Sequence, residues 1–102
     1  MFARVASFEN IDSARAAATL EEAEAIGRPL IGQLSGYVGN FELAAENGKV
    51  LSVTLFDTEE NARGAERTFD EVLPQRLGHL FADWSGRRIS VDRYEVVSHD
   101  WK

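Results

Sequence analysis

The chain has 102 residues, a length typical of one compact domain, and we expect a single domain over residues 1–102. Its 17 Asp and Glu residues outnumber its 11 Lys and Arg residues, and the net charge of −6 disfavours nucleic acid or an anionic membrane as a partner. The absence of cysteine excludes disulfides and cysteine-based metal sites. The N-terminal residues lack a signal-peptide pattern and no apolar run approaches the ~20 residues of a membrane span, so we expect a cytoplasmic location.

The first third of the chain predicts a strand followed by a helix. Residues 2–8 mix aromatic, β-branched and small side chains, as a half-buried strand does. A helix then starts at Asp12 or Ser13, because apolar residues recur at helical spacing, with the acidic run at residues 21–24 as its solvated face. We expect a break or kink at residues 27–29 (Gly-Arg-Pro), since proline cannot donate a backbone hydrogen bond.

The middle of the chain predicts a hairpin. Residues 37–45 and 50–56 have strand character, and alternation predicts one shared face for Tyr37 and Phe41. Between the strands, Asn47-Gly48 supplies the positive φ angles of a two-residue type I′ turn. Residues 50–56 are apolar on both parities, as expected of a central strand covered on both faces.

The last part of the chain predicts a second helix and a fourth strand. Residues 57–60 (Asp-Thr-Glu-Glu) can form a capping box with Asp57 as the cap, and apolar residues then step by three and four. We expect Pro74 to end this helix or to mark a second short turn through Leu77. Residues 78–86 show no clear period, and residues 87–97 return to strand character.

The resulting order is strand, helix, strand, strand, helix, strand, which is the ferredoxin-like βαββαβ plait of the α+β class. Its simplest form is a four-stranded antiparallel sheet with both helices on one face. The other face is left bare although its strands carry apolar residues. We therefore expect a second copy of the chain to cover it, as a homodimer through the sheet faces.

Four features carry a resemblance to a known group: the short opening strand, a helix ending in a proline-containing turn, residues 34–39 (LSGYVG) and residues 53–60 (VTLFDTEE). Over nearly its whole length the chain resembles the antibiotic-biosynthesis-monooxygenase (ABM)-like dimeric α/β-barrel proteins. The resemblance implies two chains packed sheet to sheet into a barrel, each with a pocket between its sheet and helices. Some members oxidise aromatic polyketides or quinols without metal or cofactor, some degrade haem, and many have no established activity.

Two departures from that group bear on function. Phe56 stands where the group often has tryptophan, which keeps a ring but loses the indole N–H donor. The haem-degrading branch uses a histidine on the second helix, and residues 59–77 contain none. We therefore disfavour haem degradation and expect neither a metal nor a cofactor.

Three polar residues are candidates for catalysis. His79 titrates near neutral pH and lies in a segment that could roof the pocket, although an exposed loop histidine would look the same. Asn40 and Arg93 are strand residues whose side chains reach solvent, pair across the dimer, or point into a wet cavity. Arg4 on the first strand carries the same ambiguity.

Aromatic residues are the candidates for a ligand pocket, and each could equally be core. They are Tyr37, Phe41, Phe56, Phe69, Phe81 and Trp84. Two functions remain open: a cofactor-independent monooxygenase acting on an aromatic quinol or polyketide-like molecule, and a non-catalytic dimeric module that binds a small hydrophobic ligand or serves a stress or regulatory role.

Overall fold

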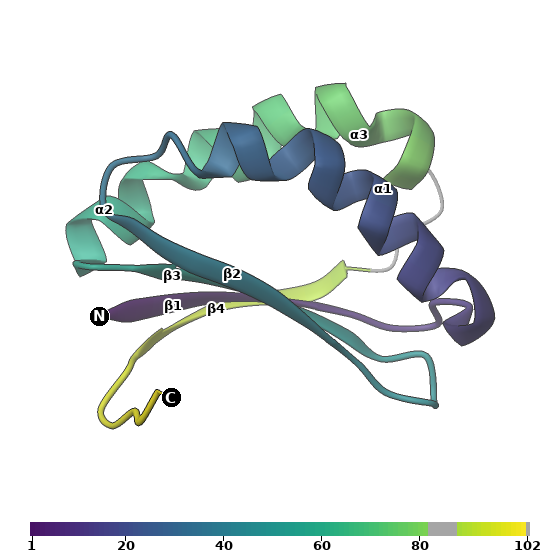
Figure 1. Cartoon of the computed structure of the whole chain (residues 1–102), viewed down its shortest axis with the longest axis horizontal. Coiled ribbons are helices and arrows are strands. Elements are labelled where there is room, and N and C mark those ends of the chain that lie inside the picture. Colours follow the sequence, from purple (N-terminus) through teal and green to yellow (C-terminus); the bar gives the residue numbers. More distant parts are fainter. Residues whose placement is uncertain (82–87, 102) are drawn as a thin grey trace.

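The computed structural model describes residues 1–81 and 88–101, apart from the side chains of residues 13–16 and 79–81. Its four strands form one antiparallel sheet in the order β2-β3-β1-β4, and the helices cover a single face (Figure 1). This arrangement confirms the predicted ferredoxin-like plait. The elements in chain order are β1 (Phe2–Phe8), α1 (Ser13–Ile31), β2 (Tyr37–Ala44), β3 (Val50–Phe56), α2 (Glu59–Gly64), the π-helical turn η1 (Thr68–Val72), α3 (Leu73–Phe81) and β4 (Arg88–Glu95).

The first helix runs without interruption to Ile31, so the break predicted at residues 27–29 is wrong. Pro29 lies in the last turn of α1 and lacks the N–H that would donate to the Ala25 carbonyl, yet the helix continues to Ile31. Gly27 serves packing: a Cβ atom there would lie 3.7 Å from Leu73 Cδ2 and 3.8 Å from Leu77 Cδ1. These are ordinary van der Waals distances, so a methyl group would fit between α1 and α3, whereas a larger side chain would meet both leucines.

A β-bulge in β2 changes which residues face the helices. Tyr37 pairs with Phe56 and Gly39 pairs with Leu55, so two steps along β2 correspond to one step along β3. The extra residue of β2 forms the bulge. Tyr37 and Asn40 therefore face the helices, whereas Phe41 faces away and is 41% exposed. The shared face predicted for Tyr37 and Phe41 is wrong, because alternation fails across the bulge.

The hairpin loop is longer than predicted. Ala44 pairs with Val50, which leaves residues 45–49 as the connection. The N–H of Gly48 donates to the Ala45 carbonyl at 3.2 Å, and only Gly48 of the Asn47-Gly48 pair has a positive φ, at 85°. A type I′ turn needs two consecutive positive φ angles. The structure therefore has a wider loop with glycine at its single left-handed position.

The second helical region begins one residue later than predicted. Thr58, not Asp57, is the N-cap of α2, and its hydroxyl accepts a hydrogen bond from the N–H of Asn61 at 3.2 Å. Asp57 instead accepts from the Asn61 side chain at 2.8 Å and donates its own N–H to the carbonyl of Gly36 at 2.8 Å. Pro74 starts rather than ends a helix, because it lies in the first turn of α3, where proline is tolerated.

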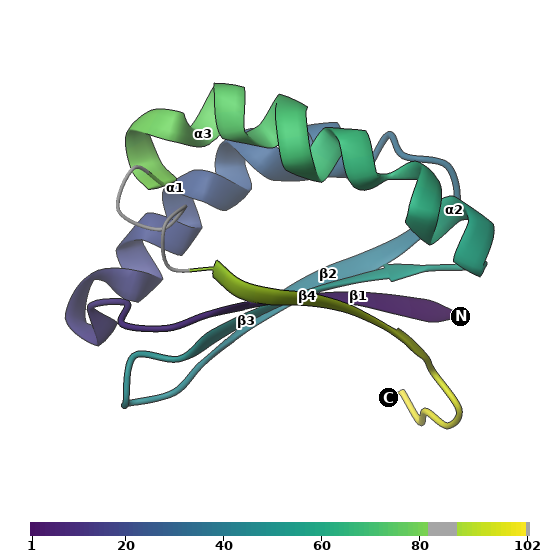
Figure 2. The same cartoon turned by 180° about the vertical axis from the view of Figure 1, so that it is seen from behind.

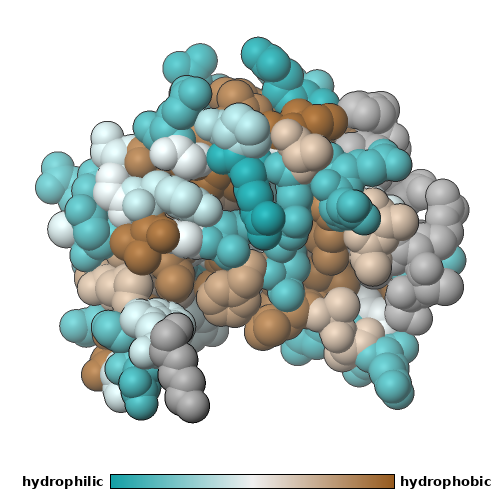
Figure 3. All heavy atoms as spheres, viewed as in Figure 1, coloured by the Kyte–Doolittle hydropathy of each residue, from teal (hydrophilic) through white to brown (hydrophobic). Residues whose placement is uncertain are grey.

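The sheet face opposite the helices is largely apolar, with a buried centre and exposed hydrophobic residues toward its edges, namely Phe41, Leu43 and Tyr94. Ala3, Val53 and Leu55 form a cluster there that Val5 and Val96 extend. Figures 1 and 2 show all helices on one side of the sheet, with the C-terminal end of the chain on the other. In Figure 3, hydrophobic side chains reach the surface beside the sheet, below the helices. Within residues 1–81 and 88–101, no helix combines the length and apolar character that crossing a membrane requires.

Candidate functional site

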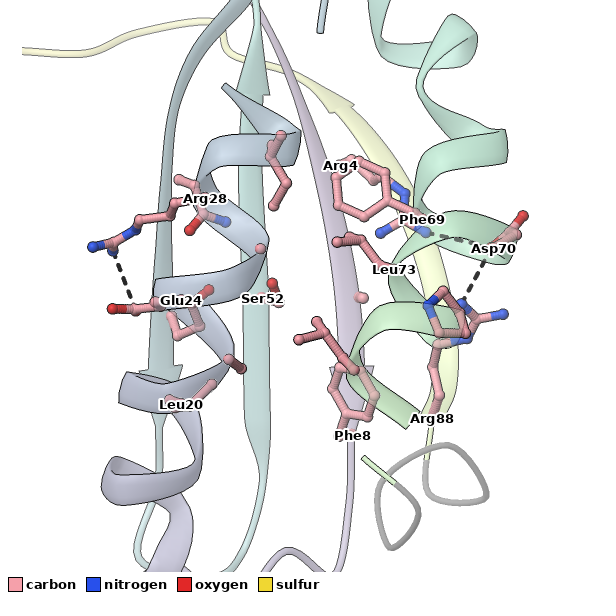
Figure 4. Close-up of a pocket in the computed structure, with 18 residues that line it drawn as sticks. Arg4, Phe8, Leu20, Glu24, Arg28, Ser52, Phe69, Asp70, Leu73 and Arg88 are labelled. Carbon is pink, nitrogen blue, oxygen red and sulfur yellow. Dashed lines mark hydrogen bonds and ion pairs between the residues drawn. The ribbon is translucent and has the colours of Figure 1, made fainter. Parts of the chain in front are cut away.

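A cavity of about 440 Å³ lies between the helix-facing side of the sheet and the helices α1 and α3 (Figure 4). This volume falls in the range of small-molecule binding sites. Its walls are mostly apolar, and the small polar side chain of Ser52 on β3 lies in its floor between two groups of charged or polar residues. The apolar lining residues are Ala6, Phe8, Leu20, Ala23, Gly27, Ile31, Phe69, Leu73, Pro74 and Leu77.

Charged side chains line the cavity in two separate groups. Figure 4 shows Glu24 and Arg28 on the α1 side, and Arg4, Asp70 and Arg88 on the opposite side. The strand order explains this separation, because β3 lies between β2 and β1. Two interstrand spacings amount to roughly 10 Å. The cavity therefore has a carboxylate end beside β2 and an arginine end beside β1 and β4.

The carboxylate end consists of Glu42 on β2 and Glu24 on α1, with Arg28 beside them. Burial raises the pKa of Glu42 to about 7, and the hydrogen bond and negative charge of Glu24 add to the increase. Arg28, whose Nη2 lies 3.2 Å from Glu24 Oε1, and the amide of Asn40 oppose it. A carboxyl with this pKa is present in both forms near neutral pH, so it can accept or return a proton.

Asn40 is held in place at the carboxylate end. Its Nδ2 donates to the Val53 carbonyl and to the hydroxyl of Thr54, each at 3.2 Å. The register places Asn40, Thr54 and Arg4 in one row across three strands on the helix-facing side. The buried Thr54, which holds the Asn40 amide, lies between the strands that carry the two ends of the cavity.

The arginine end is built around Arg4, whose side chain is only 3% exposed. Its Nε lies 3.6 Å from Glu66 Oε1 and its Nη2 lies 3.8 Å from Asp70 Oδ1. These contacts pair charges but are too long for hydrogen bonds, and neither of the two buried nitrogen atoms has a hydrogen-bond partner within residues 1–81 and 88–101. Burial lowers the pKa of Arg4, and the two carboxylates oppose that shift.

The π-helical turn η1 supplies two of the groups around Arg4. The ring of Phe69 lies beneath the guanidinium, with its centroid 4.0 Å from Cζ, in a cation–π contact. Asp70 follows it and also pairs with Arg88 at 3.4 Å. Because π-helical turns are rare and often mark functional sites, this segment adds weight to the cavity as a site.

The structure brings some of the predicted pocket residues together. Asn40 and Phe69 line the cavity. Tyr37 instead packs with Ile31 and Leu77, and Phe56 is fully buried beside Ala62 and Ala65, so neither is among the lining residues. Phe41 lies on the opposite sheet face, which corrects its predicted pocket position.

The remaining predicted site residues lie outside the cavity lining or outside the described part of the chain. Arg93 is not among the lining residues; it contacts Glu66, which pairs with the lining residue Arg4. His79 and Phe81 belong to α3, but their side chains are not among those described, and Trp84 lies outside the described residues. Their predicted roles stay predictions.

The sequence did not predict that Glu24 and Glu42 would lie together at the cavity. Glu24 was expected in a solvated acidic run, and Glu21 and Glu22 are indeed exposed, but Glu24 lines the cavity. A signal was present, because Glu24 shares a helix face with Leu20 and Ile31. Glu42 follows Asn40 by two residues on β2, so it shares that face once the bulge is known.

Among the side chains that the structure describes, no group of three or more histidine, aspartate or glutamate residues could hold a metal ion. No protein-family model and no curated protein matches the sequence.

Solved structures match the chain over nearly its whole length. A structure from Bordetella bronchiseptica assigned to the antibiotic biosynthesis monooxygenases is 17% identical, with a TM-score of 0.68 over 95% of this chain and 97% of that one. A Streptomyces coelicolor monooxygenase from the gene ActVA-Orf6, in complex with the ligand nanaomycin D, is 15% identical, with a TM-score of 0.72 over 99% and 91% of the two chains. This chain has the antibiotic biosynthesis monooxygenase fold. A dimeric ferredoxin-like protein from an uncultured marine organism shares the ABM-like fold at 13% identity, with a TM-score of 0.72 over 99% and 98%.

Proposed function

We propose that the cavity binds a small aromatic molecule and that the protein is a cofactor-independent monooxygenase acting on a quinol or polyketide-like substrate. The observation that supports this most is a carboxyl group with a pKa near neutrality, Glu42, on the wall of a mostly apolar cavity. Oxygenation without a cofactor requires the substrate to be deprotonated before it can reduce O₂. A base whose pKa lies near the working pH performs that step best.

In the proposed reaction the Glu42 carboxylate removes a proton from an acidic methylene or hydroxyl group of the substrate. Asn40 positions Glu42, and Arg4 stabilises the anion that forms. The anion then reduces O₂. For a methylene carbon the overall change is CH₂ + O₂ → C=O + H₂O, in which one oxygen atom stays on the carbon and the other leaves as water.

Two residues named from the sequence keep roles in this proposal. His79 is a candidate to return the proton. Arg93 contacts Glu66, which itself pairs with Arg4, so Arg93 is a positioning residue for the arginine end.

We also propose that the protein is a homodimer joined through the open sheet faces. Support comes from the exposed hydrophobic side chains of Phe41 and Leu43 on β2, which extend the apolar cluster around Val53. The same fold occurs in the structure described as a dimeric ferredoxin-like protein.

Oxygen uptake tests the reaction. The protein is incubated with a panel of anthrones and naphthohydroquinones in the presence of EDTA, and ¹⁸O₂ incorporation is followed by mass spectrometry. We expect a rate about tenfold or more above buffer, a loss of about tenfold in E42Q, and no change in E21Q, a control for an exposed glutamate of α1. A rate equal to buffer for every substrate contradicts the monooxygenase. Binding of these molecules without uptake would instead indicate the non-catalytic ligand-binding module.

A further inference from the structure

We infer that the arginine end of the cavity is an anion-recognition subsite, which receives the ionised oxygen of a flat aromatic ligand, as a carboxylate or as a phenolate or enolate. This inference rests on the proposed function in so far as the cavity must be a ligand site, and it deepens that proposal by naming the ligand class. It does not require turnover.

The first observation is the unsatisfied hydrogen-bonding capacity of Arg4. A guanidinium has five N–H donors, and two of the three nitrogens of Arg4 are buried without a hydrogen-bond partner. Leaving buried donors unpaired is costly, so native proteins rarely do so. The nearest protein acceptors, Glu66 Oε1 and Asp70 Oδ1, lie 3.6 Å and 3.8 Å from these nitrogens, so an oxyanion at hydrogen-bond distance from Arg4 would complete its pairing.

The second observation is a surplus of positive charge. Glu66 contacts both Arg4 and Arg93, and Asp70 contacts both Arg4 and Arg88, so two carboxylates are shared by three guanidinium groups. The balance is 3 − 2 = +1. Water is largely excluded around Arg4, so this charge attracts an anion more strongly than a surface arginine would.

The third observation is the shape of the approach to Arg4. Phe69 covers one face of the guanidinium and itself lines the cavity, so a flat ligand can lie against the ring with its oxygen directed at Arg4. Aromatic stacking and a charged hydrogen bond would then act on the same molecule.

The opposite end of the cavity sets the orientation of the ligand. Glu24 and Glu42 repel a second anionic group, but they accept a hydrogen bond or a proton from a neutral one. The favoured ligand therefore carries one ionised oxygen at the arginine end and an uncharged O–H or acidic C–H at the carboxylate end.

Titration with matched probes tests the subsite. The probes are 2-naphthoate, its neutral analogue 2-naphthamide, and 2,6-naphthalenedicarboxylate, followed by calorimetry. We expect 2-naphthoate to bind about tenfold more tightly than either of the others. In R4Q this preference over the amide should disappear. R63Q is the matched control, because Arg63 is exposed and, among the residues that the structure describes, pairs with Glu59 of its own helix; it should retain the preference.

A second variant covers the case in which R4Q fails to fold. Arg88 lines the cavity but is 42% exposed, so R88Q should fold and bind 2-naphthoate about threefold to fivefold more weakly, with 2-naphthamide unchanged. Equal affinity of the wild type for acid and amide, absence of binding to both, or an unchanged preference in folded R4Q or R88Q would overturn the subsite. Arginine-dependent binding without oxygen uptake would refute the monooxygenase alone, and uptake without a preference for the acid would refute the subsite alone.

Discussion

Glu24 on α1 and Glu42 on β2 meet at one end of the cavity, so a helix and an edge strand are joined through two groups that repel each other when both are ionised. A proton shared between them removes that repulsion. The contribution of this pair to the stability of the folded state therefore depends on pH.

Stability should decrease as pH rises through the pKa of Glu42. The folded pKa of about 7 lies above the ordinary value of 4.5, so the folded state holds this proton more tightly than the unfolded state. The contribution to stability is then fully present below about pH 4.5 and is lost as pH rises to about 7 and beyond. Glutamine does not titrate, so E42Q lacks this pH dependence. The free energy of unfolding of E42Q minus that of the wild type should therefore increase by about 1 kcal/mol from pH 5 to pH 8. This is less than the full pKa shift, because water still reaches the carboxyl.

Urea unfolding at both pH values measures the effect. E21Q, at an exposed position of the same helix, should leave the pH profile of the wild type unchanged. An identical profile in E42Q and the wild type would show that Glu42 does not carry the shift. Arg28 and Asn40 face the same carboxyl, and both remain in all the variants compared.

Gly36 should not tolerate a side chain. Its φ of 74° is left-handed, and a Cβ atom would lie 2.1 Å from Asp57 Oδ1 and 2.5 Å from Asn61 Nδ2. G36A must therefore break the contact between Asp57 and Asn61 and strain the backbone, and we expect a loss of about 2–3 kcal/mol. G64A is the control, because nothing lies within 4 Å of its added Cβ and alanine favours the helix by roughly 0.5–1 kcal/mol.

The midpoints of urea unfolding for both glycine variants decide this prediction. If G36A unfolds at the wild-type midpoint, the left-handed turn before β2 is not required for stability.

Much of the fold was predictable because local patterns and the final structure agree. The boundaries predicted for β1 and β3, residues 2–8 and 50–56, coincide with the observed strands, since both lie in the middle of the sheet where apolar patterning is strong. The errors have tertiary causes. Gly27 suggests a helix end by its identity, but it lies inside α1 at the contact with Leu73 and Leu77 of α3, which no local pattern reveals.

The candidate site was less predictable, because it depends on side chains brought together from different elements. Asn40 and Phe69 could be named from their residue types and positions. Glu42 was hidden by the bulge in β2, which reverses the faces of the residues that follow it. The sequence does not decide whether the Arg4 side chain is buried, because its burial depends on contacts with η1. The spacing of apolar residues in that segment does not indicate a π-helical turn.

The contact between α1 and α3 should accept a methyl group at Gly27 but not a larger side chain. The added Cβ of alanine would be in ordinary van der Waals contact with Leu73 and Leu77, so G27A should be neutral or stabilise by roughly 0.5–1 kcal/mol through helix propensity. G27L must separate the helices or fill the cavity that this residue lines, at a cost of about 1–3 kcal/mol. Thermal unfolding of both variants measures this, and equal stability of G27L and the wild type would show that the helices are not tightly packed.

A charge on the open sheet face should prevent the proposed dimer. Phe41 is 41% exposed and lies on that face beside the buried Val53, so a second sheet packed against it would bury the Phe41 ring. We expect the wild type to have twice the 11.3 kDa chain mass by light scattering at micromolar concentration. In F41E a buried unpaired carboxylate should weaken association by about 2–4 kcal/mol and yield the monomer. I26E, at an exposed position on α1, is the matched control and should remain dimeric. A wild type of 11.3 kDa would contradict the dimer, and a dimeric F41E would place its interface elsewhere.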